Sequence, residues 1–96
     1  MPTRTKSYGA WLQEKLVDPA TAANYLNAAM NESREMFLVA LRKVSEANRM
    51  AVVAEKANIS RESLYRTLSE KGNPELSTLS GVLKALGLRI TIEPAG

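Results

Sequence analysis

The chain has 96 residues, of which 45% are hydrophobic and only 5% aromatic, and its formal net charge is +3. This length allows one domain with a modest core, the few aromatic side chains favour packed helices over a sheet sandwich, and the mild positive charge suits either a polyanionic partner or ordinary surface solubility. Cysteine and histidine are absent, which excludes disulfides, the usual zinc sites and histidine-dependent catalysis, so neither a metal nor a cofactor is expected.

Residues 1–6 are predicted to form a flexible basic arm, and residues 7–96 a single helical domain. The N-terminal part of this domain is predicted to contain two helices. Residues 1–6 are polar and basic, without the apolar core of a secretory signal. No later apolar run approaches the roughly 20 residues that span a bilayer, so we expect a cytoplasmic protein. Ser7 can cap a helix over 8–16, and Asp18-Pro19 marks the start of the next. The expected inner side chains are Trp11, Leu12, Leu16, Ala22, Leu26, Ala29 and Met30, with Tyr25 beside them.

The central part is predicted to form four more helices, which gives an all-α fold of five to six helices. The segments cover 34–48 and 50–57 and begin again at Ser60 and Ser77, which can act as caps. Gly72 is expected to end one helix in the left-handed conformation, with Asn73-Pro74 preventing its resumption, and Gly87 is expected to end the last one. The expected inner side chains are Phe37, Leu41, Val44, Ala47, Val53, Ala57, Leu64, Leu68, Leu79, Val82, Leu83 and Leu86.

The C-terminal segment 88–93, "LRITIE", changes to a period of two. Leu88, Ile90 and Ile92 alternate with Arg89, Thr91 and Glu93, which predicts a short β-strand. A lone strand leaves an unpaired edge, and its simplest partner is the same strand of a second copy. We therefore predict a homodimer joined through Leu88, Arg89, Ile90, Thr91 and Ile92; the alternative is an extended tail packed on its own helices.

Residues 50–69 have the pattern of a helix-turn-helix unit. Ala54 is the small residue that lets the second helix cross closely, Ile59 is the inward apolar residue of the turn, and Leu64 and Leu68 anchor the second helix. The start of that second helix is the end that enters the major groove in such motifs. Residues 49–73 carry five basic and three acidic side chains, a local charge of +2. The outward residues are Ser60, Arg61, Glu62, Ser63, Tyr65 and Arg66.

Each outward residue has a predicted role in DNA binding and a plainer alternative. Arg61 and Arg66 can reach guanine edges or phosphates, unless they pair with Glu62 or Glu70. Glu62 can accept a hydrogen bond from a cytosine amino group or orient one of the arginines.

The hydroxyl groups and the following loop supply the remaining candidates. Ser60 is expected to act mainly as a helix cap, while Ser63 and Tyr65 offer hydroxyls to phosphate or base. Tyr65 could instead pack against the last helix. Lys71 and Asn73, in the loop after the second helix, are predicted phosphate contacts.

Four segments in order, "DPATAANYLNAAMN", "MFLVALRKVSEA", "SRESLYRTLSEKGNPELSTL" and "VLKALGLRITIEP", resemble addiction-module antidote (antitoxin) proteins that carry an Xre/Cro-repressor-type helix-turn-helix. The resemblance covers about residues 10–94, with the helix-turn-helix core at about 34–87. It implies a DNA-binding antitoxin that represses its own operon and neutralises a RelE/ParE-like toxin. Two positions depart from the Xre pattern: Met50 stands where Gln is frequent, and Asn58 where Gly is usual.

Three readings of the function follow. The favoured one is a dimeric repressor that is also an antitoxin, with the N-terminal helices and Tyr8, Trp11 and Tyr25 as candidates for the toxin-binding surface or for the core. The alternatives are a stand-alone Xre-type repressor without a toxin and a helical adaptor that does not bind DNA. An enzyme is not expected, because no Ser-x-x-Lys or Gly-rich phosphate loop is present and the carboxylates are scattered.

Overall fold

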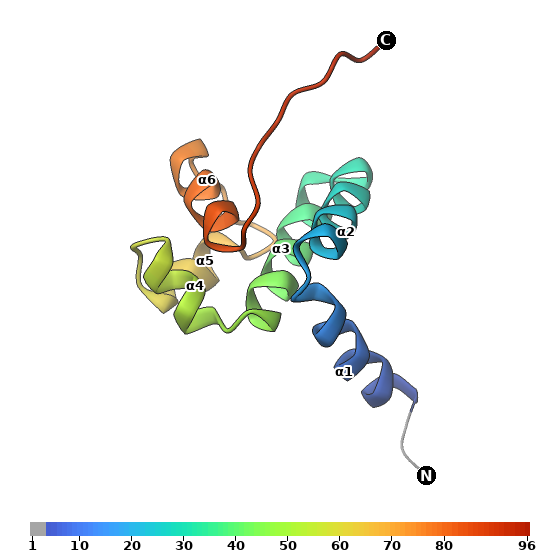
Figure 1. Cartoon of the computed structure of the whole chain (residues 1–96). Coiled ribbons are helices and arrows are strands. Elements are labelled where there is room, and N and C mark those ends of the chain that lie inside the picture. The colour runs from blue at the N-terminus through green and yellow to red at the C-terminus, as the bar shows by residue number, and fades with distance from the viewer. Residues whose placement is uncertain (1–3) are drawn as a thin grey trace.

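Helices alone make up the regular structure of residues 4–96, the part of the chain that the computed structural model describes (Figure 1). Over this range no strand is formed. The prediction of a mainly helical fold is therefore confirmed. The helices are α1 (Arg4–Leu16), α2 (Pro19–Glu32), α3 (Arg34–Ala47), α4 (Met50–Lys56), α5 (Arg61–Thr67) and α6 (Leu76–Ala85).

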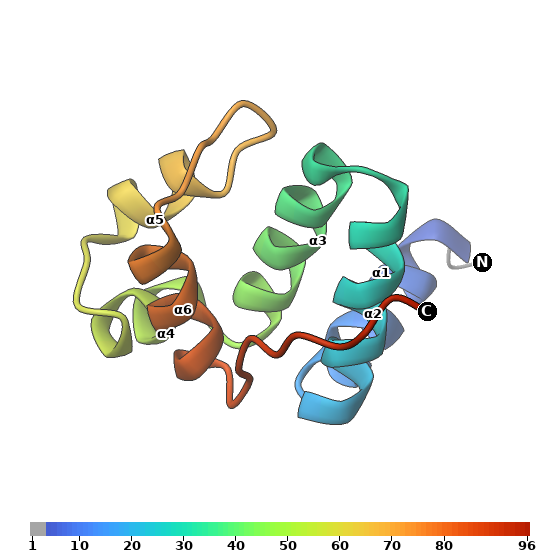
Figure 2. The same ribbon diagram turned by 90° about the horizontal axis from the view of Figure 1, so that it is seen from above.

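Helix α3 lies between two groups of helices (Figure 2). It packs against α1 and α2 on one side and contacts α4 on the other, while α4 contacts both α5 and α6. The contact between α3 and α4 thus joins the three N-terminal helices to the three C-terminal ones. None of the helices over residues 4–96 combines the length and apolarity needed to cross a membrane.

Helix α1 differs from its prediction at both its start and its buried face. It begins at Arg4 rather than Tyr8, because nothing between residues 4 and 8 is a helix breaker. Residues 4–6 of the predicted arm are therefore helical, and residues 1–3 lie outside the described part. Trp11, predicted to be inside, is 50% exposed, whereas Leu16 is buried as expected.

Helices α2 and α3 begin at the predicted caps. The Asp18 carboxylate accepts hydrogen bonds from the Thr21 backbone N–H (3.0 Å) and hydroxyl (2.9 Å), and the Ser33 hydroxyl accepts one from the Met36 N–H (3.0 Å). The backbone bond from Thr21 is the main cause that lowers the pKa of Asp18. Since the folded-state pKa is lowered, this cap stabilises the protein at neutral pH and its contribution is lost as the pH falls through that pKa.

The buried side chains form one cluster to which all six helices or their immediate C-terminal ends contribute. The predicted inner positions of α3 to α6 are buried or half-buried, while Met30, predicted inside, is 54% exposed. Leu38 and Ala40 are buried without having been predicted, because the buried stripe of α3 is wider than a spacing of three and four implies. The buried apolar residues are Leu16, Ala22, Leu26, Phe37, Leu38, Ala40, Leu41, Val44, Met50, Val53, Ala54, Leu64, Leu68, Val82, Leu83 and Leu86.

A single polar side chain among the described residues interrupts this core without a partner. Ser45 in α3 is fully buried, and its Oγ has no hydrogen-bond partner. A buried hydroxyl without a partner costs about 1–3 kcal/mol. Ser45→Ala removes that hydroxyl and adds helix propensity, so we expect the free energy of unfolding to rise by about 1 kcal/mol. Chemical denaturation of both proteins measures it; a loss of stability would mean that the hydroxyl is satisfied.

Helix α6 begins one residue before the predicted cap. Glu75, not Ser77, is its N-cap residue, and Glu75 makes no side-chain capping bond. At the other end the helix stops before Gly87, as predicted, and Gly87 has a φ of 79°. The Gly87 N–H donates to the Lys84 carbonyl (3.0 Å) and the Leu88 N–H to the Leu83 carbonyl (2.8 Å), the two bonds of a Schellman motif.

Gly72 has a different structural role from the predicted one. It is not among the described residues of positive φ, so the expected left-handed conformation is wrong. Its N–H donates to the Ser69 carbonyl (2.8 Å), and a Cβ added there would lie 2.1 Å from the Thr67 carbonyl oxygen. Close approach of the backbone, rather than its dihedral angle, therefore requires glycine at this position.

Residues 88–93 do not form the predicted strand within the single chain. They leave α6 as an extended tail that runs out of the helical body (Figure 1). The reason is physical: a strand exists through its backbone pairing, and no second strand lies within residues 4–96 to supply it.

Candidate nucleic-acid interface

The turn between α4 and α5 fixes how the two helices follow each other. Asn58 has a φ of 61°, the left-handed conformation that asparagine tolerates better than most residues. Its N–H donates to the Glu55 carbonyl (3.0 Å) and the Ile59 N–H to the Ala54 carbonyl (3.0 Å), which again makes a Schellman motif. Ile59 packs on the core and Ala54 is buried, as the sequence predicts.

Helix α5 is attached to the core by one side only. Leu64 is fully buried and Leu68, directly after the helix, is 1% exposed. On the other side, Arg61 lies four residues before Tyr65 and Glu62 four residues before Arg66, so these neighbours share an outer face. The exposed residues of this outer side are Arg61, Glu62, Tyr65 and Arg66.

The two serines at the start of α5 are hydrogen-bonded to each other. The Ser60 Oγ accepts a hydrogen bond from the Ser63 N–H (3.0 Å), and the two hydroxyls are hydrogen-bonded at 2.9 Å. Ser60 is therefore the N-cap of α5, the main task predicted for it. Ser63 is half-buried beside it.

The arginines of α5 make no polar side-chain contact among the residues whose side chains the structure describes. The side-chain hydrogen bonds near them are the serine pair and the Ser69 hydroxyl bond to the Arg66 carbonyl (2.9 Å). Tyr65 is 42% exposed, so it does not pack fully against α6. Two guanidinium groups and a phenol are thus presented together to solvent.

The loop after α5 is attached to α3 by a residue that the sequence did not single out. Arg34, at the start of α3, donates from Nη2 to the Gly72 carbonyl and to the Asn73 Oδ1 (3.0 Å). Because an arginine can only donate, the amide nitrogen of Asn73 must face away from it, free to donate elsewhere. Arg34 is 38 residues from Gly72 along the chain, so no local pattern could have revealed the contact.

The loop also brings Lys71 close to a second basic residue of α3. Lys71 and Arg42 line the same shallow hollow, together with Glu70 and Leu68. Both basic side chains are exposed. The structure therefore adds Arg34 and Arg42 to the predicted candidates Lys71 and Asn73, as neighbours on α3.

The predicted dimer residues lie away from α5, on the C-terminal tail. Leu88 packs on the core and its N–H is bonded to Leu83, whereas Arg89, Ile90, Thr91 and Ile92 are exposed. No cluster of three or more metal-binding side chains occurs in the described part of the chain. What the α5 side offers is positive charge, hydrogen-bond donors and one aromatic ring, a set that suits a polyanion.

Comparison with known proteins shows similarity to a family and to a curated protein. A family described as "Probable addiction module antidote protein" matches residues 10–94. An uncharacterized protein of Haemophilus influenzae is 41% identical over 70 residues, which cover 72% of each chain. No solved structure matches this sequence.

Proposed function

Because the chain belongs to the family of probable addiction module antidote proteins, we propose that it is a sequence-specific DNA-binding antitoxin that represses its own operon. The main support is the outer side of α5, where Arg61 and Arg66 are exposed and Leu64 holds the helix on the core. Arginine forks suit guanine edges and phosphates. In this proposal α4 and α5 are the helix-turn-helix, and α5 is the recognition helix.

The proposed DNA contacts are of two kinds: phosphate contacts position the protein on the duplex, and base contacts read its sequence. Lys71, the Asn73 amide and the neighbouring Arg42 would bind phosphates and set the protein's register on the duplex. Arg61 and Arg66 would read bases, with Glu62 accepting from a cytosine amino group or orienting an arginine. Ser63 and Tyr65 would add hydroxyl contacts.

A mobility shift with the DNA upstream of the protein's own gene tests this proposal. We expect a shifted protein–DNA complex that persists in excess unrelated DNA. Its affinity should fall steeply between about 50 and 200 mM salt, because phosphates bound by the protein release counterions. Equal affinity for unrelated DNA of the same length would contradict sequence-specific repression. Absence of binding at the lower salt would contradict any DNA-binding role.

The family implies a cognate toxin as the protein's partner, and we propose a RelE/ParE-like toxin that binds at α1. Tyr8 and Trp11 are exposed there with ring centroids 5.8 Å apart, and the Lys15 ammonium lies 5.8 Å from the indole ring centroid. Exposed aromatic residues in a cluster are typical of the central contacts of protein interfaces.

The toxin surface gives a testable prediction. Replacing Tyr8 and Trp11 together by alanine should weaken binding to the protein encoded beside this gene about 30-fold or more, since such anchors contribute about 2 kcal/mol or more. The measurement is calorimetry on the two purified proteins. Val52→Ala, at an exposed apolar residue of α4, is the matched control. Unchanged affinity in the double variant would place the toxin elsewhere.

We further propose that the DNA-binding unit is a homodimer joined through residues 88–92. One such module reads too few base pairs for specific binding, and two copies related by a two-fold axis would read a palindromic operator. The extended tail supports this, because its backbone beyond the Leu88 N–H is open for pairing with a second chain.

A further inference from the structure

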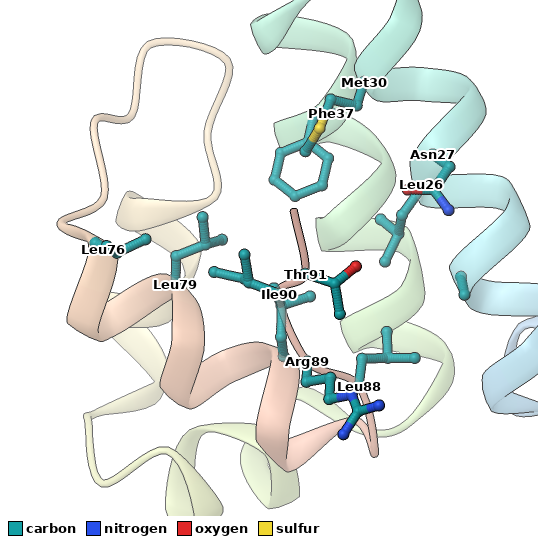
Figure 3. A pocket seen from close by; sticks show the side chains of 12 residues that line it. Leu26, Asn27, Met30, Phe37, Leu76, Leu79, Leu88, Arg89, Ile90 and Thr91 are labelled. Carbon is teal, nitrogen blue, oxygen red and sulfur yellow. The ribbon is translucent and has the colours of Figure 1, made fainter. Parts of the chain in front are cut away.

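The C-terminal tail forms one side of an apolar groove that its own side chains do not fill (Figure 3). The groove has a volume of about 420 Å³ and is walled by residues of α2, α3 and α6 and by tail residues 88–91. At its rim Met30 and Leu76 are largely exposed, and further along the tail Ile92 is 94% exposed. A second strand beside this alternating tail would pair with its open backbone edge and cover its apolar side.

The structure limits which tail residues can take part in a backbone ladder. The Leu88 N–H is already bonded to the Leu83 carbonyl, and Pro94 has no N–H to donate. Leu88 and Pro94 both occupy even positions, on the same side of the strand as Ile90 and Ile92. In an antiparallel pair, hydrogen-bonded and non-hydrogen-bonded residues alternate. The even positions must therefore be the non-hydrogen-bonded ones, and Arg89, Thr91 and Glu93 must carry the ladder.

We propose that the tail pairs with the tail of a second copy in one register, with the two-fold axis at Thr91. Thr91 then faces the partner's Thr91, Arg89 faces the partner's Glu93, and Ile90 faces the partner's Ile92. The ladder has about six backbone hydrogen bonds, two from each hydrogen-bonded pair. This register rests on the homodimer proposed above and specifies its interface.

Charge complementarity selects this register from its neighbours. A shift by one residue would put the apolar side of one strand on the opposite face from that of the other. An axis at Ile90 would keep the faces together but would set Arg89 against the partner's Thr91 and leave both Glu93 side chains without a cation. Only the Thr91 axis places opposite charges against each other at both ends, and directly opposed unlike charges stabilise a sheet.

The same register accounts for the exposed isoleucine. Because opposed residues of an antiparallel pair share a face, the partner's Ile92 lies beside Ile90 and is directed to the side that carries the groove. The most exposed large apolar side chain among the described residues would thus be covered, and the groove would gain a wall from the second subunit.

Single cysteines test the register, since the natural chain has none. In Thr91→Cys the two Cα atoms would be about 5.5 Å apart, within the roughly 4.4–6.8 Å range that a disulfide spans. In Arg89→Cys or Glu93→Cys the like residues would be about 14 Å apart, four residues along the ladder. We expect mild oxidation to cross-link Thr91→Cys, neither of the other two alone, and the mixture of those two. Preferential cross-linking of Ile90→Cys would overturn the register while leaving a tail-joined dimer.

Charge reversal provides an independent readout. Arg89→Glu and Glu93→Arg should each weaken the homodimer about 10-fold, because like charges would then oppose each other twice, and mixing the two variants should restore a heterodimer of near wild-type affinity. Analytical sedimentation measures the homodimer affinity of each variant and the heterodimer affinity of the mixture. Homodimers of unchanged affinity and a statistical mixture would overturn the register. A wild-type chain that sediments as a monomer would instead overturn the dimer itself, and the mobility shift reports separately on DNA binding.

Discussion

Replacing Arg61 and Arg66 together by alanine is expected to weaken binding to the DNA upstream of the gene by about 100-fold or more. Each arginine that reads a guanine contributes about 1–3 kcal/mol of discrimination, and a 100-fold loss corresponds to about 2.8 kcal/mol. Both side chains are exposed on α5, so the fold should remain intact. Fluorescence anisotropy with labelled DNA measures the affinity, and the melting temperature of the variant checks the fold.

The control for this variant must remove the same charge elsewhere. Lys15 on α1 and Lys43 on α3 are exposed, and Lys43 lies beside α1 rather than α5. Their double alanine variant has the same net charge as the arginine variant and should bind with nearly wild-type affinity. Equal losses in both variants would indicate a general effect of charge. Unchanged affinity in the arginine variant would exclude α5 as the recognition helix.

Gly72→Ala is expected to lower the free energy of unfolding by about 3 kcal/mol, which is the largest stability effect we predict. The new Cβ would lie 2.1 Å from the Thr67 carbonyl oxygen and 2.9 Å from its carbon. Overpacking against backbone costs about 1–3 kcal/mol, and the loop would also have to give up its bond to Arg34. Thermal denaturation should show a melting temperature lower by roughly 15 °C.

Gly9→Ala is the matched control. Gly9 lies inside α1, and nothing lies within 4 Å of an added Cβ. Alanine in a helix interior is favoured over glycine by about 1 kcal/mol, so this variant should be slightly more stable than the wild type. If Gly72→Ala proved as stable as Gly9→Ala, the loop between α5 and α6 could not have the conformation described above.

Local patterns predicted much of the helical fold. Asp18-Pro19, Ser33 and Ser60 each act as the helix start that their side chains suggested, because a cap is a contact within three residues. Asn58 likewise takes the left-handed conformation of the turn before α5. These features depend on neighbours in the sequence, which is why the sequence suffices to predict them.

Features that depend on distant partners were missed or misassigned. Arg49, the residue before α4, has a φ of 70°, a left-handed conformation that its long charged side chain gave no reason to expect. The contact of Arg34 with the loop at Gly72 joins segments far apart in the sequence. Trp11 and Met30 follow the helical spacing of buried residues, yet no neighbouring element covers them in the single chain. Periodicity indicates which face is apolar but not whether another surface lies against it.

The candidate site likewise contains features that depend on sequence neighbours and features that depend on distant contacts. The outward positions of α5 follow from the two leucine anchors, so their exposure could be predicted. The positions of Arg42 and Asn73 depend on how the loop folds onto α3. The strand predicted for the tail depends on a pairing partner that residues 4–96 do not supply, and the alternation of the tail alone does not reveal where such a partner lies.

An NMR titration of the isotopically labelled 96-residue chain with the DNA upstream of its gene tests the proposed recognition helix most directly. If α5 reads the operator, the largest amide shifts will fall within residues 60–73, with Arg61 and Arg66 among them, and α1 will be almost unaffected. Amide shifts confined to α1 or to the C-terminal tail, with residues 60–73 unchanged at saturating DNA, would contradict that role for α5.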